Sequence, residues 1–345
     1  MKKFSIILAV FLMLMLTMGL VVGCGGQDEG SSQNETNQSS SEKQEPAKEE
    51  VKDVSLRIGT AGTGGAFYPI GGALAEVISH MDHVSAAAEV TGGSVENIRR
   101  MGMGELDLAF AMGDATYQGY TGTGNQFSKT GAMDNIRVLT NIYSNAVHFV
   151  TLENSGLKTL DDLKGKRVAV GSPGSGTELK AKALLEIAGL TYDDFEEEFV
   201  TFNEAAQGMK DKQIDAAVIS VGLPGAAIID LATSKDIYLI PTTKDYEAKV
   251  AEELPFFQPG VIPAGTYPGQ DEDVPALYIK GQILIRDDFD EDFVYNLTRH
   301  IYENLEGWTQ VHQAAKEITL EGAAPAPIPL HPGAEKYYKE MGVIK

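Results

Sequence analysis

The stretch "IGTAGTGGAFYPIGG" (Ile58–Gly72) joins a strand-like run to a helical pattern through a loop rich in glycine and threonine. Pro69 is well suited to the first turn of the helix that follows. Glycines let backbone N–H groups approach a ligand, and a helix start presents unpaired N–H donors with partial positive charge. We therefore expect this loop to form one half of a small-molecule clamp, with an ordinary tight turn as the alternative.

A second loop of the same kind, "GSPGSGT", begins at Gly171, again between a strand-like and a helical pattern. The two loops start 112 residues apart (171 − 59). Asp107 and Asp215, which each precede a buried strand, lie 108 apart (215 − 107). Recurring strand–helix alternation is typical of an α/β architecture with parallel sheets. We expect two lobes of similar topology, with both loops at the carboxyl ends of strands facing one cleft.

Other site chemistries find little support in the residues. Phe67 occupies the third glycine position of a GxGxxG pattern, and the second loop lacks the lysine of a phosphate loop. His80 and His83 have no partners at zinc-like spacing. The acidic run from Asp288 lacks the glycine and glutamate of a calcium loop. No G-x-S-x-G motif is present. We expect no cofactor, no metal and no enzymatic activity.

The N-terminus has the features of an exported lipoprotein. "MKK" precedes the apolar run Phe4–Val22, and small residues lead into Cys24, the only cysteine. We expect residues 1–23 to be a signal peptide, Cys24 to be lipidated and residues 24–53 to be a disordered tether. An uncleaved membrane anchor is the alternative. Both place the folded body outside the cytoplasmic membrane, attached to it, with no intramolecular disulfide.

The formal net charge is −21. Nucleic-acid binding draws on clustered Lys and Arg, so we expect no nucleic-acid partner. The acidity favours solubility but does not exclude an anionic ligand, because a local site can oppose the global field.

The predicted lobe one comprises residues 54–146 and 256–345, and lobe two comprises 147–255, with hinges near 145–149 and 256–263. A ligand carboxylate is expected on the helix start of the second loop, with the first lobe closing over it. Asp114 suits an amino group and favours an amino acid over a keto acid. The predicted ligand-binding residues are Thr63, Gly64, Tyr68, Ser94, Gly113, Asp114, Gly174, Ser175, Gly176, Thr177, Gln207 and Gly222.

Several stretches together resemble the TAXI-family solute receptors of TRAP transporters, and the resemblance covers nearly the whole chain after the tether. It implies a two-lobed, class II periplasmic-binding-protein fold with a hinge and an interlobe ligand cleft. It also implies a small carboxylate ligand, such as glutamate, glutamine or 2-oxoglutarate, and a TRAP membrane permease as partner. The stretches are "IGTAGTGGAFYPIGGALA", "TGGSVENIRRMGMGELDLAFAMGDATYQGYTG", "LKTLDDLKGKRVAVGSPGSGTELKAKALLEIAGL" and "HPGAEKYYKEMG".

Two other functions remain open from the sequence. One is a ligand sensor that presents its ligand to a membrane signalling protein. The other is an extracytoplasmic enzyme on the same fold. Turnover of a bound ligand would favour the enzyme, and a neighbouring gene for a large multi-span protein would favour transport.

Overall fold

The computed structural model describes residues 53–345. The predictions about the signal peptide, Cys24 and the tether up to residue 52 lie outside the described residues. Within residues 53–345, no helix is both long and apolar enough to cross a membrane.

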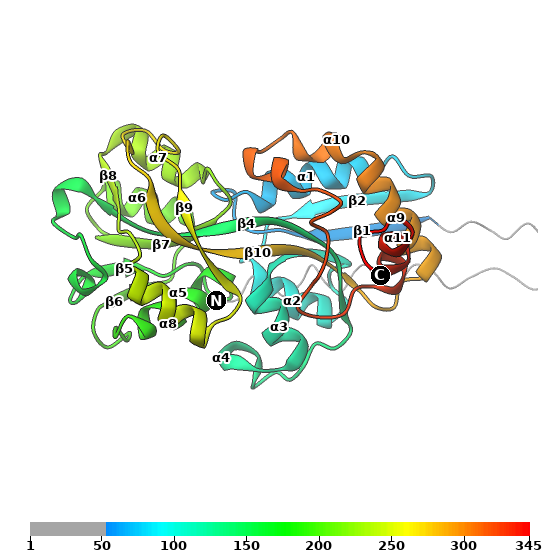
Figure 1. The fold of residues 1–345 in the computed structure, drawn as a ribbon, viewed down its shortest axis with the longest axis horizontal. Helices are drawn as coiled ribbons and strands as arrows, with labels where there is room; N and C mark the ends of the chain where they lie inside the picture. The colour runs from blue at the N-terminus through cyan, green and yellow to red at the C-terminus, as the bar shows by residue number, and fades with distance from the viewer. Residues whose placement is uncertain (1–52) are drawn as a thin grey trace, which may run out of the picture. The chain divides into compact units, whose positions relative to one another are not determined.

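The first half of the fold is an α/β unit with helices on both faces of its strands (Figure 1). β1 lies between β2 and β3 and pairs with both in parallel. β3 is buried along its whole length, as expected for a strand covered on both faces. The elements are β1 (Val54–Gly59), α1 (Phe67–Ile78), β2 (Val84–Glu89), α2 (Ser94–Gly102), β3 (Leu108–Met112), α3 (Gly113–Thr121) and α4 (Gly124–Phe127).

The second half repeats this arrangement. β5 lies between β6 and β7 and pairs with both in parallel, as β1 does with β2 and β3. The elements are β5 (Arg167–Ala169), α5 (Gly176–Ile187), β6 (Glu196–Glu198), α6 (Phe202–Lys210), β7 (Ala216–Val221), α7 (Ala226–Ser234), β8 (Ile237–Leu239), α8 (Lys244–Glu253) and β9 (Phe257–Ile262).

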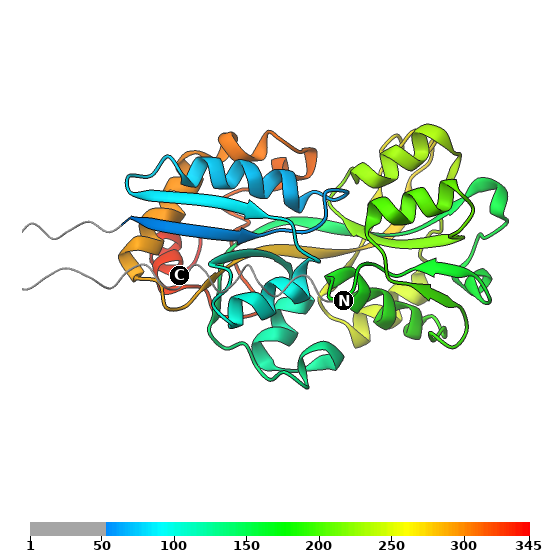
Figure 2. The same cartoon turned by 180° about the vertical axis from the view of Figure 1, so that it is seen from behind.

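Two long antiparallel strands, β4 (Ile136–Leu152) and β10 (Val274–Arg286), join the halves into one sheet of order β2-β1-β3-β10-β4-β7-β5-β6. Figure 2 shows both strands running through the middle of the molecule from one half into the other. β10 pairs with β3 of the first half, and β4 pairs with β7 and β8 of the second. The two lobes are therefore connected through shared strands at the waist.

Three C-terminal helices pack on the first half. They are α9 (Glu291–Glu303), α10 (Leu305–Thr309) and α11 (Pro332–Glu340). The indole of Trp308 is fully buried, and its N–H donates to the carbonyl of Ile301 at 2.9 Å. Tyr302, Tyr337 and Tyr338 form an aromatic cluster between α9 and α11. Short 3-10 turns complete the chain at Glu153–Ser155, Leu160–Leu163 and Gln313–Glu317.

The predicted boundary of lobe two at residue 255 falls between α8 and β9 and stays a prediction. β9 pairs with the Val274–Ile279 part of β10, which lies beside the second half of the molecule (Figure 1). The sequence placed residues from 256 onward in lobe one. The other boundaries stay a prediction, because β4 and β10 belong to both halves.

The internal repeat predicted from Asp107 and Asp215 includes the same hydrogen bonds to an arginine in both halves. The N–H and Nε of Arg57 donate to Oδ2 of Asp107 at 2.8 and 3.1 Å. The same two atoms of Arg167 donate to Oδ2 of Asp215 at 2.9 and 3.0 Å. Each ion pair ties the first strand of its lobe to the segment entering the third. The two lobes thus fix their strand order by the same contact.

Candidate ligand-binding cleft

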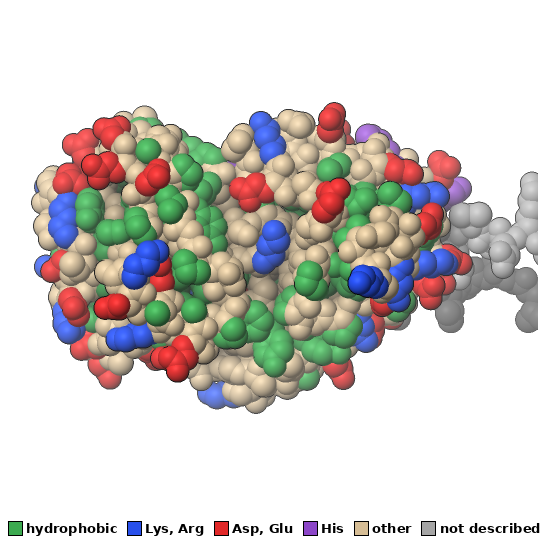
Figure 3. Space-filling view, in the orientation of Figure 1, with side chains coloured by type: hydrophobic (Ala, Val, Ile, Leu, Met, Phe, Trp, Pro, Cys, Tyr) green, Lys and Arg blue, Asp and Glu red, His purple; other side chains and the backbone are tan. Residues whose placement is uncertain are grey.

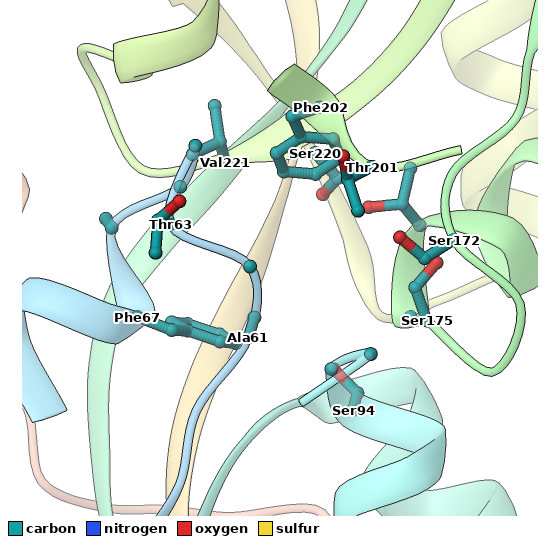
Figure 4. A pocket seen from close by; sticks show the side chains of 18 of the residues that line it. Ala61, Thr63, Phe67, Ser94, Ser172, Ser175, Thr201, Phe202, Ser220 and Val221 are labelled. Atoms are coloured by element: carbon teal, nitrogen blue, oxygen red, sulfur yellow. The ribbon is translucent and has the colours of Figure 1, made fainter. Parts of the chain in front are cut away.

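A cavity of about 200 Å³ lies between the lobes. It sits where the parallel strands of both lobes end and their loops lead into helices, as open α/β sheets predict. Figure 4 shows residues of the first lobe, such as Thr63 and Ser94, facing residues of the second, such as Ser172 and Thr201. The lining residues are Ala61–Phe67, Val90, Gly92–Ser94, Met112, Asn145, Ser172, Ser175–Thr177, Thr201–Asn203, Ser220 and Val221.

Four helices begin at this cavity. The first residues of α1, α2, α5 and α6 all belong to its lining. The first N–H groups of a helix have no partner within the helix, and the helix dipole adds partial positive charge at that end. Four such ends around one space form a cradle for negative charge.

The cavity has no charged wall. None of the lining residues, all within residues 53–345, carries an ionisable side chain. Hydroxyl groups and the amides of Asn145 and Asn203 supply its polar side chains, and Phe67, Phe202 and Val221 supply apolar surface. In a protein of net charge −21, this local absence of carboxylates removes the main obstacle to binding an anion.

The start of α5 is the best-defined part of the cradle. Ser175 is the N-cap, and its Oγ accepts the N–H of Glu178 at 2.9 Å. This bond leaves the N–H groups of Gly176 and Thr177 without a partner in the helix. Gly171 and Gly174 have φ values of 100° and 72°, which favour glycine. The loop glycines therefore shape the turn that presents Ser175–Thr177 to the cavity.

The lobes touch on one side of the cavity through α2, α4 and α5. The N–H of Glu96 donates to the carbonyl of Gly174 at 3.0 Å. The amide of Gln126 in α4 donates to both carboxylate oxygens of Glu178, at 3.0 and 2.8 Å. Burial raises the pKa of Glu178, against the hydrogen bonds that its carboxylate accepts. These contacts hold the structure in a closed arrangement.

The other side is closed by the first loop. The N–H of Ala227 in α7 donates to the carbonyl of Gly64 at 3.2 Å. The amide of Asn203 donates to Oγ1 of Thr63 at 3.2 Å. Lobe-to-lobe bonds thus flank the cavity on both sides.

Behind the cleft, a buried ion pair also joins the lobes. Nζ of Lys180 in α5 donates to Oδ1 of Asp114 in α3 at 3.3 Å and to the carbonyl of Gly176 at 2.8 Å. Lys180 is 0% exposed. Burial lowers its pKa, and Asp114 opposes that shift. Hydrophobic side chains gather over α3 where the lobes meet (Figure 3), and Tyr117 packs there against Phe256 with ring centroids 5.3 Å apart.

Six of the predicted site residues line the cavity, and six do not. Those in the lining are Thr63, Gly64, Ser94, Ser175, Gly176 and Thr177; those outside it are Tyr68, Gly113, Asp114, Gly174, Gln207 and Gly222. No bound molecule tests a ligand role for any of them.

Three of the outside residues are engaged elsewhere. Asp114 is held by Lys180, so its predicted role towards an amino group has no basis in the geometry. Gln207 donates to Asp211 at 2.8 Å on an exposed face of α6. A Cβ on Gly222 would come within 2.4 Å of the Tyr143 ring, so this glycine serves close packing.

The other three lie beside the site. The ring of Tyr68 is 37% exposed to solvent in the first turn of α1. The carbonyl of Gly174 is used by Glu96. Gly113 follows the lining residue Met112 and faces the carbonyl of Lys280.

The starts of α6 and α2 decide which of their residues reach the cavity. Asn203 does not cap α6; Thr201 does, in a capping box with Glu204. The helix therefore begins earlier, and Thr201 and Phe202 line the cavity instead of Gln207. Ser94 does not cap α2 either, because its Oγ accepts the N–H of Met112 at 3.2 Å.

Other lining residues missed from the sequence are Asn145, Ser172 and Ser220. Ser172 stands inside the quoted second loop, and Ser220 stands at the end of a strand that the sequence predicts. Attention to hydroxyl residues at strand ends would have found both. Asn145 lies within β4, where the sequence predicts a hinge near residues 145–149 but no ligand-binding residue.

The shared sheet, the repeated lobes and the interlobe cavity define the class: an α/β, two-lobed periplasmic-binding-protein fold, as predicted. The chain belongs to the NMT1-like family, whose model matches residues 58–342.

A solved structure with a TM-score above 0.5 shares this fold, and two further structures match with lower scores. PhnD1 from Prochlorococcus marinus, in complex with methylphosphonate, is 15% identical with a TM-score of 0.53, over 84% of this chain and 99% of its own. The alkanesulfonate-binding protein SsuA from Xanthomonas axonopodis pv. citri, bound to MOPS, is 16% identical with a TM-score of 0.45, over 85% and 92%. A putative L-cystine ABC transporter from Listeria monocytogenes is 14% identical with a TM-score of 0.46, over 79% and 99%.

The assignment to TAXI-family receptors of TRAP transporters is wrong. The family whose model matches is the NMT1-like family, over nearly all the described residues. The TRAP permease was expected as a partner only because of that resemblance. Without the resemblance, this expectation has no support. The fold that the resemblance implied is confirmed, because it is common to a wider set of binding proteins than the family named.

Proposed function

We propose that this protein is the extracytoplasmic solute-binding component of a transport system, and that it captures a small organic anion and presents it to a membrane transporter. It acts by binding and not by catalysis. A lipid on Cys24 and the tether that follows hold it at the membrane. The observation that carries the proposal is the convergence of four helix starts on an interlobe cavity whose lining has no ionisable side chain.

The acid group of the ligand rests on the start of α5. There the N–H groups of Gly176 and Thr177 and the hydroxyl of Thr177 donate to its oxygens. The starts of α2 and α6 add partial positive charge, so no arginine is required. Phe67, Phe202 and Val221 take the apolar part of the molecule. A carboxylate, sulfonate or phosphonate suits this cradle.

Binding and lobe closure are coupled. The ligand touches both lobes in the closed arrangement only, so it favours closure by its differential affinity for that state. The contacts Ala227–Gly64 and Gln126–Glu178 add to closure on opposite sides of the cavity. A transporter that recognises the closed form would thereby distinguish the loaded protein.

The test is thermal unfolding of the purified protein after any co-purified ligand has been removed by unfolding and refolding and identified by mass spectrometry. The panel comprises small carboxylates, sulfonates and phosphonates, with sugars and simple amines as controls. An anion at a thousandfold its Kd should stabilise the protein by about 4 kcal/mol, a shift of several degrees in Tm. Stabilisation by a sugar or an amine alone contradicts the proposal.

Replacing Thr177 with Val should weaken anion binding by about 1–2 kcal/mol, because the variant keeps the shape of the side chain and loses its hydroxyl donor. Isothermal titration with the anion found above measures the change. Thr298→Val is the matched control, since it removes a hydroxyl bonded within α9. Equal affinity in wild type and Thr177→Val would remove that hydroxyl from the site.

A further inference from the structure

The carboxylates in the first turns of α2, α3, α5 and α6 all accept hydrogen bonds from protein groups, and none of them belongs to the cavity lining. Asp114 pairs with Lys180, and Oε2 of Glu96 accepts the N–H of Gly92 at 2.8 Å. Glu178 accepts two hydrogen bonds from Gln126, and Glu204 accepts the N–H and hydroxyl of Thr201. Each of these helices begins at or beside the cavity, yet none directs a carboxylate into the lining. The site thus has no negative group for a cation.

The electrostatics of the lining also disfavour a cation. An ammonium group inside the cavity would face the positive ends of four helices. It would also lose part of its hydration without gaining a carboxylate partner, which is costly. A hydroxyl or keto oxygen at the same position carries no charge and can pair with serine and threonine hydroxyls.

Asn145 supplies a neutral partner for such a group. It lies on β4, the strand shared by the lobes, and lines the cavity while only 2% exposed. Its buried Nδ2 has no hydrogen-bond partner among the described residues. An unused amide this deep in the protein is costly unless a ligand or water engages it. Because an amide both donates and accepts, it suits a hydroxyl or keto oxygen.

We propose that the cavity selects small anions that lack an ammonium group, such as hydroxy or keto acids and their sulfonate or phosphonate counterparts, and rejects amino acids of the same skeleton. This rests on the proposed function and names its ligand class. Asn145 is the residue that determines the choice. It contacts the neutral oxygen on the carbon that carries the ammonium group in an amino acid.

The test compares ligand pairs that differ only in a hydroxyl or an ammonium group: lactate with alanine, malate with aspartate, 2-hydroxyglutarate with glutamate, 2-hydroxyisocaproate with leucine, and isethionate with taurine. Kd values are measured by isothermal titration on the ligand-free protein. In whichever pair binds, we expect the hydroxy compound to bind at least about tenfold more tightly. An amino compound that binds as tightly as its hydroxy partner overturns the inference and leaves the anion-binding function standing. A protein that binds no anion in these pairs or in the panel above contradicts the proposed function itself, and the inference with it.

The variant Asn145→Asp tests the role of Asn145 itself, which the comparison of ligand pairs does not. It should shift the preference of the site towards the amino compound. The new carboxylate has the size of the amide. It gives an ammonium group in the cavity the anionic partner that the wild-type site does not supply. We expect the preference for the hydroxy compound to fall by at least about tenfold. Asn145→Leu, of similar size, should weaken the hydroxy compound without improving the amino compound. An unchanged hydroxy-to-amino ratio in Asn145→Asp would contradict the role of Asn145.

Discussion

Replacing Lys180 with Met should lower the free energy of unfolding by about 3–5 kcal/mol, the usual cost of removing one member of a buried ion pair. The substitution leaves Asp114 buried in α3 without its cationic partner Lys180 and removes the bond to the carbonyl of Gly176. Oδ2 of Asp114 already has no partner among the described residues, so no second donor compensates. Equilibrium unfolding in urea, followed by circular dichroism, measures the loss.

Lys182→Met is the matched control, since it makes the same change two residues along α5. Lys182 pairs with Glu186 at 2.6 Å on the helix surface, and such pairs contribute about 0–1 kcal/mol. The double variant Lys180→Met/Asp114→Asn should recover most of the loss. Its asparagine removes the unpaired charge and keeps an acceptor for the N–H of Ala115. A loss in Lys180→Met no larger than in Lys182→Met would show that the pair does not stabilise the closed lobes.

The repeat shows what the sequence can reveal about this fold. Asp107 and Asp215 were matched only by their place before a buried strand. In the structure both hold an arginine of the first strand, Arg57 or Arg167, through the same atoms. Local patterns succeed here because each lobe folds around short strands whose neighbours follow within a few turns of chain.

The crossing strands show where sequence patterns fail. β4 runs for 17 residues, and its burial pattern has almost no alternation because both faces are covered. Its residues also mix asparagine, threonine, serine and histidine with apolar ones, so the stretch resembles neither a half-buried strand nor a continuous apolar one. Its main partner β10 lies more than a hundred residues away, and pairing at that distance leaves no local mark.

The same difference between local and long-range features separates the site residues that the sequence predicts from those that it does not. The glycine loops placed Ser175, Gly176 and Thr177 at the cleft, because a strand, a glycine turn and a helix start are local features. Asp114 lies outside the cavity lining, and its partner Lys180 belongs to the other lobe. A buried ion pair formed on closure cannot be inferred from the residues that flank either member.

Replacing Ser175 with Asp should weaken anion binding on the order of 100-fold. Ser175 caps α5 and lines the cavity, so the new carboxylate would occupy the place proposed for the ligand's acid group. Two like charges about 5 Å apart at an effective dielectric constant of about 20 repel by about 3 kcal/mol. This corresponds to a loss of affinity on the order of 100-fold, measurable by isothermal titration.

Ser175→Asn separates charge from size. Asparagine, aspartate and serine are comparable N-caps, so both variants should keep the bond to the N–H of Glu178. The aspartate should also interact favourably with the dipole of α5, so Ser175→Asp should unfold at a temperature no lower than the asparagine variant. Normal stability with lost binding in the aspartate variant alone is a combination that simple damage to the fold does not produce. If both variants lose binding equally, the side chain's size and not its charge is responsible, and the start of α5 would not be the anion site.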